Sequence, residues 1–199
     1  MNILAFTFNR SEYGILKPLL EDLNSNKLFN LSLCIGGAHL NNKFGMTIKE
    51  IISDNIKINF KIDSEDSSNE DIFSDILKNS KKIIIKARPQ AIILLGDRYE
   101  TLAVSITSAM MSIPIIHLHG GELTFGSMDN KYRDCISILS EIHFTATKKS
   151  ANRLKKIGLK RNIYNVGSLS IENIQKFNFI SFEEFLKKID FDVRRLFFI

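Results

Sequence analysis

Acidic side chains lie directly after two apolar segments of this sequence. Gly96-Asp97-Arg98 follows the segment Ala91–Leu95. Glu122 follows the segment Ile115–His119 after two glycines, and a third acid, Asp129, lies further along the chain. Because ligands bind outside the carboxyl ends of the strands in open parallel sheets, we expect the three carboxylates to face one cleft. Crowded carboxylates have separated pKa values, which suits them to general acid–base catalysis.

Each of these acids also has a purely structural interpretation. Asp97 can cap the N-terminus of the helix that follows it, and Glu122 can be a solvent-exposed loop residue. Asp129 and Arg133 stand four residues apart, which is the spacing of an ion pair on one face of a helix. Arg133 can instead brace a carboxylate or a phosphate in the cleft, so both interpretations stay open.

Two basic side chains and two glycines suit substrate binding. Arg10 follows the first predicted strand, where its guanidinium can hold a diphosphate through paired hydrogen bonds; the alternative is an ordinary surface arginine. Gly120 and Gly121 would let the backbone approach a ligand closely. His39 lies in a glycine-rich loop, where we expect it to shape the substrate pocket.

His117 and His119 alternate along a predicted strand, so that both would point to the same face. Together with Asp97 they could bind a metal ion, as in a metal-dependent hydrolase. Hydrogen-bonded strand histidines are the more ordinary interpretation, and we therefore predict no metal site and no cofactor. We expect His119 to contribute to substrate binding.

The overall composition is that of an ordinary globular protein. Of 199 residues, 44% are hydrophobic and 25% are charged, with a net charge of +5. The lysines are scattered, so the charge is compatible with a phosphate-bearing substrate and does not indicate a nucleic-acid partner. No apolar run has the length of a membrane span, and the sequence shows no signal-peptide pattern and no paired cysteine spacing. We expect a cytoplasmic protein without a membrane partner.

Short apolar segments alternate with amphipathic segments from one end of the chain to the other. This alternation predicts an α/β fold, a doubly wound parallel sheet of the Rossmann-like type with helices on both faces. The predicted strands are Asn2–Phe8, Asn30–Gly36, Ile56–Phe60, Ala91–Leu95, Ile115–His119, Ile142–Thr145 and Ile163–Val166. The predicted helices are Tyr13–Asn24, Gly45–Ser53, Asn69–Arg88, Tyr99–Met111, Asp129–Ser140, Lys148–Ile157 and Ser170–Lys176.

The end of the sequence predicts a change of domain. We expect residues 1–178 to form one domain. Ser181–Lys188 has the pattern of a capped helix, and the basic and apolar run Val193–Ile199 resembles the first strand of another unit. Because chain ends are usually polar, we expect residues 179–199 to be the start of a second domain that is otherwise absent, or a crossover segment.

Five stretches of the sequence together resemble one known family. The chain is similar, over nearly its whole length, to the N-terminal half of the hydrolysing UDP-N-acetylglucosamine 2-epimerases, which supply sugars for sialic-acid-type biosynthesis. The stretches that carry this resemblance are Asn9-Arg10-Ser11-Glu12-Tyr13-Gly14, Gly36-Gly37-Ala38-His39-Leu40 with Phe44-Gly45-Met46-Thr47, Gly96-Asp97-Arg98-Tyr99-Glu100, His117-Leu118-His119-Gly120-Gly121-Glu122, and Asp129 with Arg133 followed by His143-Phe144.

The resemblance implies a GT-B architecture, in which two Rossmann-like domains face each other across a cleft. It implies elimination of UDP from a UDP-sugar and hydration of the resulting glycal, with Asp97, Glu122 and Asp129 in the acid and base roles. The C-terminal domain of the family contributes most of the nucleotide recognition and a catalytic histidine. The family also implies a homo-oligomer. A UDP-N,N'-diacetylbacillosamine epimerase and a non-catalytic, truncated sugar-nucleotide-binding fragment remain alternatives.

Four positions within the matched stretches depart from the common pattern of the family. Asp134 and Glu141 each replace a common histidine, and Ile138 replaces a common lysine. Phe8 occupies a position that is usually small. We expect these changes to affect the geometry around the helix that begins at Asp129.

Overall fold

The computed structural model describes residues 1–63, 68–176 and 181–188, and its centre is one parallel sheet. Seven strands hydrogen-bond in the order β3-β2-β1-β4-β5-β6-β7, and every neighbouring pair is parallel. This confirms the predicted doubly wound, Rossmann-like α/β fold. The strands are β1 (Asn2–Thr7), β2 (Asn30–Gly36), β3 (Ile58–Ile62), β4 (Ala91–Leu95), β5 (Ile115–Leu118), β6 (Ile142–Thr145) and β7 (Ile163–Asn165).

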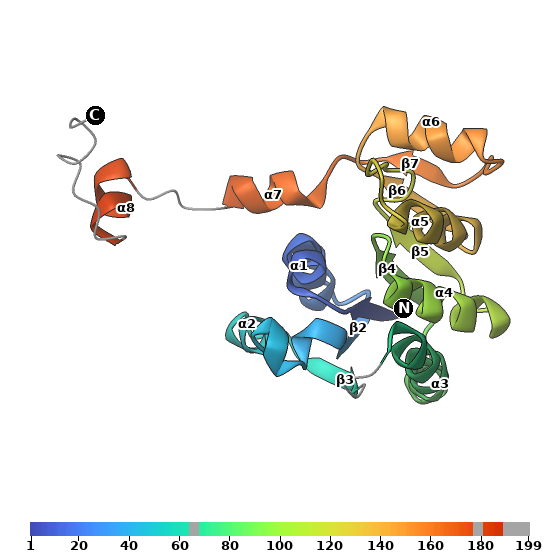
Figure 1. Cartoon of the computed structure of the whole chain (residues 1–199), viewed down its shortest axis with the longest axis horizontal. Coiled ribbons are helices and arrows are strands. Elements are labelled where there is room, and N and C mark those ends of the chain that lie inside the picture. Colours follow the sequence, from blue (N-terminus) through green and yellow to red (C-terminus); the bar gives the residue numbers. More distant parts are fainter. Residues whose placement is uncertain (64–67, 177–180, 189–199) are drawn as a thin grey trace.

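Helices cover both faces of this sheet (Figure 1). Single 3₁₀ turns, η1 (Gly37–His39) and η2 (Asn42–Phe44), lie between β2 and α2. The α-helices are α1 (Arg10–Ser25), α2 (Ile48–Ser53), α3 (Asn69–Ala87), α4 (Tyr99–Met110), α5 (Asp129–Ile138), α6 (Lys148–Lys156), α7 (Leu169–Lys176) and α8 (Phe182–Lys188). None of the helices in the described part of the chain is both long and apolar enough to cross a bilayer.

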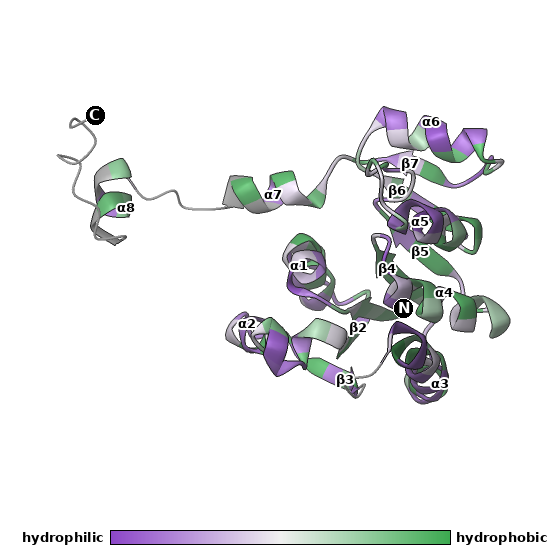
Figure 2. Ribbon diagram, in the orientation of Figure 1, coloured by the Kyte–Doolittle hydropathy of each residue, from purple (hydrophilic) through white to green (hydrophobic). Residues whose placement is uncertain are grey.

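The sheet separates two apolar cores. One contains Leu16 and Leu20 of α1 and Ile51 of α2, packed against β1, β2 and β4. The other contains residues of α3, α4 and α5 on the opposite face, among them Ile76 and Val104. Because β4 is covered on both faces, all five of its residues are buried and apolar. Figure 2 shows this hydrophobic interior along β4 and β5.

The strand order reverses between β1 and β4. The chain proceeds from β1 outward through β2 and β3, and then returns to β4 on the other side of β1. The segments that leave the carboxyl ends of β1 and β4 therefore diverge and open a crevice between them. This crevice lies beside Asn9, the residue that caps α1, and beside Asp97, which follows β4.

Several predicted boundaries were wrong by a few residues. The predicted strand Ile56–Phe60 is shifted to Ile58–Ile62, because Asn55 adopts a left-handed turn (φ 56°) and Ile56 is buried before the strand begins. Helix α1 starts three residues earlier than predicted, at Arg10, because the side chain of Asn9 accepts a hydrogen bond from the backbone N–H of Glu12.

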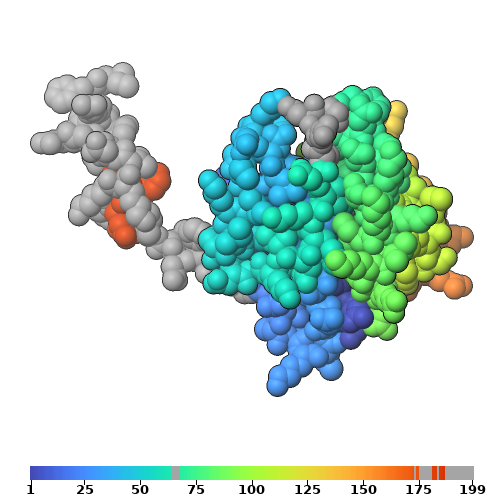
Figure 3. All heavy atoms as spheres, turned by 90° about the horizontal axis from the view of Figure 1, so that it is seen from below, coloured from blue at the N-terminus to red at the C-terminus, as the bar shows by residue number. Residues whose placement is uncertain are grey.

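The C-terminal helices extend away from the sheet. Helix α7 still contacts the body of the domain through Leu169, which packs against the core that contains α1. Helix α8 lies apart from the sheet in both Figure 1 and Figure 3. The hydroxyl of Ser181 accepts a hydrogen bond from the N–H of Glu184, as the predicted cap requires. The predicted strand-like run Val193–Ile199 lies outside the described residues.

Candidate active site

A pocket of about 250 Å³ lies at the carboxyl edge of the sheet, where the segments following β1, β4 and β5 meet. We call it the acidic pocket. It contains all three acids singled out in the sequence, together with Arg133. Its lining residues are Asn9, Ser11, Glu12, Ile15, Leu95, Gly96, Asp97, Arg98, His119, Glu122, Asp129 and Arg133.

Arg133 connects the walls of the acidic pocket. Its Nη2 forms an ion pair with the carboxylate of Asp97, and its Nη1 donates a hydrogen bond of 2.7 Å to the backbone carbonyl of Glu122. Only 7% of the Arg133 side chain is exposed, against 21% of Asp97. The local pair between Arg133 and Asp129 does not form. Asp97 does not cap α4 either, since the N-cap of that helix is Arg98.

The other two acids are held by neighbours of their own. Glu122 Oε1 lies 2.9 Å from His119 Nδ1. Asp129 Oδ2 accepts a hydrogen bond of 2.8 Å from the hydroxyl of Ser127. These contacts fix the two carboxylates on the rim of the same pocket.

The environments of Asp97 and Glu122 shift their pKa values in opposite directions. Burial raises the pKa of Asp97 above its usual value; Arg133 opposes this effect and the charge of Asp129 adds to it. Burial alone would also raise the pKa of Glu122, but the hydrogen bond from His119 and the charge of Arg133 outweigh it and lower that pKa. The pocket thus contains one carboxyl group that holds a proton more tightly than usual and one that holds it less tightly.

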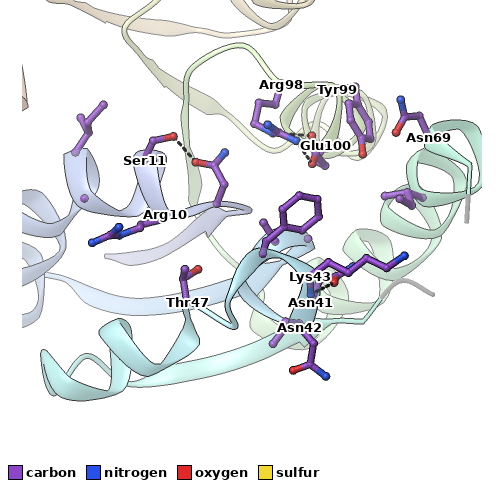
Figure 4. A pocket seen from close by; sticks show the side chains of 18 of the residues that line it. Arg10, Ser11, Asn41, Asn42, Lys43, Thr47, Asn69, Arg98, Tyr99 and Glu100 are labelled. Carbon is purple, nitrogen blue, oxygen red and sulfur yellow. Dashed lines mark hydrogen bonds and ion pairs between the residues drawn. The ribbon is translucent and has the colours of Figure 1, made fainter. Parts of the chain in front are cut away.

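A second and larger space, of about 1330 Å³, shares lining residues with the acidic pocket. Figure 4 shows the residues of this larger space. We call it the outer cavity. Arg10 and Ser11 of α1 lie on one wall, Asn42 and Lys43 on another, and Arg98, Tyr99 and Glu100 on a third. Asn9, Ser11 and Arg98 line both spaces, so the two are continuous at these residues.

Arg10 lies in the outer cavity and not in the acidic pocket. Its Nε contacts the carboxylate of Glu50 at 2.8 Å, and 73% of its side chain is exposed. Arg10 is therefore placed to meet an anion that enters the outer cavity, and its exposed ion pair with Glu50 leaves it accessible to one.

His39 and His117 are fully buried. The ring of His39 hydrogen-bonds Thr7 at 3.1 Å and Thr47 at 2.8 Å, and so ties the loop after β2 to the end of β1. The ring of His117 bonds Ser137 at 3.0 Å and the carbonyl of Gly96 at 2.8 Å. Burial lowers the pKa of both to about 4, so both are neutral near pH 7. His117 is thus a hydrogen-bonded strand histidine, and His39 shapes the loop beside the pocket without lining it.

The prediction that His117 and His119 share a strand face was wrong. Strand β5 ends at Leu118, and His119 has a left-handed backbone (φ 62°), which turns it out of the strand alternation and toward Glu122. Among the described residues, no group of three or more histidine, cysteine, aspartate or glutamate side chains could hold a metal ion.

The structure shows a packing role for Gly120 and Gly121, and the expected approach of their backbone to a ligand stays a prediction. Neither glycine lines the acidic pocket or the outer cavity. A Cβ at Gly120 would lie 2.9 Å from Ser137 Oγ, and a Cβ at Gly121 would lie 2.4 Å from the carbonyl oxygen of Ser150. The glycines therefore let the loop after β5 pack against α5 and α6, which directs Glu122 into the pocket.

Three charged residues at this edge were not singled out as individual site residues from the sequence. Glu12 lines the acidic pocket, although only 6% of it is exposed. Arg98 binds the buried carboxylate of Glu100 through two hydrogen bonds, of 2.7 and 3.0 Å. All three belong to stretches that carried the family resemblance, but nothing in their types or spacing indicated that Glu12 and Glu100 are buried.

Comparison with known proteins identifies the family. Residues 21–196 match the family model described as UDP-N-acetylglucosamine 2-epimerase. A UDP-N,N'-diacetylbacillosamine 2-epimerase (hydrolyzing) of Legionella pneumophila is 33% identical over 196 residues, which cover 96% of this chain and 52% of that protein. The chain belongs to the UDP-N-acetylglucosamine 2-epimerase family.

Other members of this epimerase family show the same partial coverage. The polysialic acid biosynthesis protein P7 of Escherichia coli is 34% identical over 184 residues, 86% of this chain and 45% of that protein. The crystal structure of the Neisseria meningitidis UDP-GlcNAc 2-epimerase bound to UDP-GlcNAc superposes with a TM-score of 0.78 at 21% identity, over 88% of this chain and 50% of that one. The chain thus spans about half the length of these relatives, and its fold is that of their N-terminal half.

The four residues that depart from the common pattern of this epimerase family do not line the acidic pocket. Asp134 pairs with Arg153 of α6. The carboxylate of Glu141 accepts a hydrogen bond of 2.6 Å from the N–H of Ile115, and Ile138 is exposed. Phe8 fills the core at the end of β1. Because none of the four side chains contributes to the wall of the pocket, they can change its geometry only through the residues that separate them from it.

Proposed function

We propose that this chain carries the sugar-binding, acid–base half of the active site of a hydrolysing UDP-sugar 2-epimerase. The observation that supports this most is the convergence of Asp97, Glu122 and Asp129 with Arg133 in one pocket at the switch point of the sheet. Carboxylates in different environments are what a reaction needs when it removes one proton and delivers another.

The first step is the elimination of UDP from UDP-N-acetylglucosamine. A carboxylate takes the proton from C2, the C2–H electron pair forms the C1=C2 double bond, and the C1–O bond breaks to release UDP. Glu122 suits the base because its pKa is lowered, and it is therefore ionised near neutral pH. Arg10 lines the outer cavity, and in this proposal it stabilises the departing diphosphate electrostatically.

The second step is the hydration of 2-acetamidoglucal. Water adds its oxygen to C1 and gives up one proton to an ionised carboxylate of the pocket, while C2 takes a proton on the face opposite to the one that was deprotonated, which gives N-acetylmannosamine. Asp97, whose pKa is raised, suits the donor of this proton. Asp129 lies beside both carboxyl groups and completes the acid–base set. No cofactor enters either step.

Two of the relatives support a second substrate. Proteins of Legionella pneumophila and Campylobacter jejuni that are 33% and 32% identical to this chain are named for UDP-N,N'-diacetylbacillosamine. Relatives named for UDP-N-acetylglucosamine are 30% identical or less. We therefore include the diacetylated sugar as the alternative substrate, to be separated from the first by the ratio of their kcat/KM values.

The half-length coverage supports a second function, namely a fragment that binds the UDP-sugar without turnover. Incubation of the purified chain with UDP-N-acetylglucosamine in D₂O separates the two. The epimerase releases UDP, seen by ³¹P NMR, together with N-acetylmannosamine that carries deuterium at C2. The fragment binds the nucleotide sugar and releases no UDP. Release of N-acetylglucosamine without deuterium at C2 would contradict the elimination mechanism altogether.

A further inference from the structure

Glu12 is a carboxyl group of the acidic pocket whose two oxygens have different surroundings. Oε2 accepts a hydrogen bond of 2.8 Å from the backbone N–H of Phe8. Oε1 is buried and has no hydrogen-bond partner in the described part of the chain. The residue lines the pocket that also holds Asp97, Glu122 and Asp129, yet only 6% of its surface is exposed.

A local structural role explains one of these oxygens but not the other. Asn9 caps α1 by accepting from the N–H of Glu12, and Glu12 reaches back to the N–H of Phe8, much as in a capping box. That arrangement uses Oε2. The backbone N–H of Asn9 also lowers the pKa of Glu12, but Oε1 still has no hydrogen-bond partner among the described residues. A buried polar atom without a partner is costly. Because Glu12 is one of the residues that line the acidic pocket, a molecule bound there would supply the partner that Oε1 lacks.

The charges around Glu12 leave it without an ion pair. The charge of Arg98 favours ionisation of Glu12, but its guanidinium is bound to Glu100, whose own negative charge opposes that ionisation. The charged groups on the other walls of the pocket are Asp97, Glu122 and Asp129, opposed by Arg133, with His119 beside Glu122. Burial raises the pKa of Glu12 to about 7, so that at slightly acidic pH the group is a neutral carboxyl. Its proton then resides on Oε1, because Oε2 already accepts from the backbone.

We propose that Glu12 is a further substrate-binding residue, whose neutral carboxyl group donates a hydrogen bond from Oε1 to an oxygen of the UDP-sugar in the acidic pocket. The inference rests on the proposed function, since it assumes that a UDP-sugar occupies this pocket. It adds a fourth carboxyl group with a role unlike those of the other three, because this one acts in its uncharged form and takes no part in proton transfer.

The substitution Glu12→Gln tests this role, since the amide keeps an acceptor for Phe8 N–H and a donor at the other position, and does not titrate. UDP-N-acetylglucosamine is the probe, because its diphosphate diester has no group that titrates near neutral pH. We expect its affinity for the unmodified chain to fall about tenfold between pH 6 and pH 8 as Glu12 loses its proton. In the Glu12→Gln variant this loss should disappear, and the affinity at pH 6 should lie within about threefold of the original. Glu21→Gln, at an exposed site of α1 outside both cavities, is the matched control.

Direct observation of the carboxyl carbon of Glu12 by ¹³C NMR, assigned with the Glu12→Gln variant, keeps the test decisive. Titration of this carbon near pH 7 in the free chain, with a shift when UDP-N-acetylglucosamine binds at pH 6, supports the inference. Titration of the Glu12 carbon between pH 4 and pH 5 overturns the inference. So does binding of UDP-N-acetylglucosamine that leaves the Glu12 signal unmoved and the affinity of the Glu12→Gln variant as dependent on pH as that of the unmodified chain. Either result leaves the proposed function intact. A chain that binds no UDP-N-acetylglucosamine overturns both, and loss of binding in the Glu21→Gln control would show that the effect is not specific to the pocket.

Discussion

The acidic pocket and the outer cavity lie at the same edge of the sheet, but they hold their charges in different ways. In the acidic pocket Arg133, with 7% of its side chain exposed, joins the segment after β4 to the segment after β5. In the outer cavity the pair between Arg10 and Glu50 has 73% and 44% of its side chains exposed. The first arrangement holds the site together, and the second leaves a cation free to exchange partners.

The difference follows from the solvent around each pair. An exposed ion pair is screened by water and contributes little to stability. A buried charge that loses its partner is left without water or protein to compensate it, and the cost is several kcal/mol. The acidic pocket is therefore expected to be rigid and intolerant of substitution, whereas the wall of the outer cavity at Arg10 should tolerate substitution and respond mainly in binding.

The largest expected effect is on turnover. Asp97→Asn removes a group able to exchange protons while keeping its size, and UDP release should fall by about 10²-fold or more. Glu21→Gln removes one negative charge from the exposed surface of α1 and should leave the rate unchanged. An Asp97→Asn variant with the original rate would remove this residue from the acid–base set.

The next effect is on the free energy of unfolding, and it compares the buried pair of the acidic pocket with the exposed pair of the outer cavity. Arg133→Met leaves the half-buried Asp97 without its cation, and the free energy of unfolding should fall by about 3 kcal/mol. The matched change Arg10→Met should alter it by less than about 0.5 kcal/mol, because that pair is exposed. Urea denaturation of both variants measures this difference, and equal losses would show that burial does not distinguish the two regions.

Two glycines of the loop after β5 test how closely it must pack. Gly121→Ala places a Cβ at 2.4 Å from the carbonyl oxygen of Ser150 at a positive φ of 78°. We expect a loss of about 3 kcal/mol from strain and overpacking together. Gly126 has a similar φ of 75° but open space around it, so Gly126→Ala should cost only about 1 kcal/mol. Thermal or urea unfolding measures the loss in the free energy of unfolding of each variant. Equal losses in the two would contradict the packing role of Gly121.

The smallest effect is the pH dependence that Glu12 adds to stability. Its folded-state pKa of about 7 lies above the ordinary value of 4.5, so the folded state holds this proton more tightly than the unfolded state. The stabilisation is complete below about pH 4.5 and is lost as the pH rises through 7; between pH 5 and pH 8 it should decrease by about 2 kcal/mol.

His39 and His117 act in the opposite sense. Their pKa values of about 4 lie below the ordinary value of 6.5, so the stability they contribute is present above pH 6.5 and lost as the pH falls toward 4. The difference between the unmodified chain and Glu12→Gln at each pH isolates the Glu12 contribution. A difference that does not change with pH would place the pKa of Glu12 near its ordinary value.

The local patterns of the sequence were sufficient for the fold. The apolar run Ala91–Leu95 is typical of a strand covered on both faces, and the alternation of such runs with amphipathic segments predicted the parallel sheet. Where predictions failed, single backbone conformations decided, such as the left-handed His119, which ends β5 one residue early. The left-handed residue accompanies a contact with Glu122, three residues on, and the packing of the next two glycines against Ser137 and Ser150. The second of these depends on residues distant in the sequence.

The sequence by itself determined which residue types stand at the ends of the strands, because strand and turn chemistry is a property of neighbouring residues. Only the tertiary structure decided how these residues pair. Arg133 could have joined Asp129 four residues away, but it is bound to Asp97 from another strand end. The tertiary structure also decided that Glu12 is buried with one oxygen unpartnered. The burial of a group and its resulting pKa depend on everything that packs around it and not on its place in the chain.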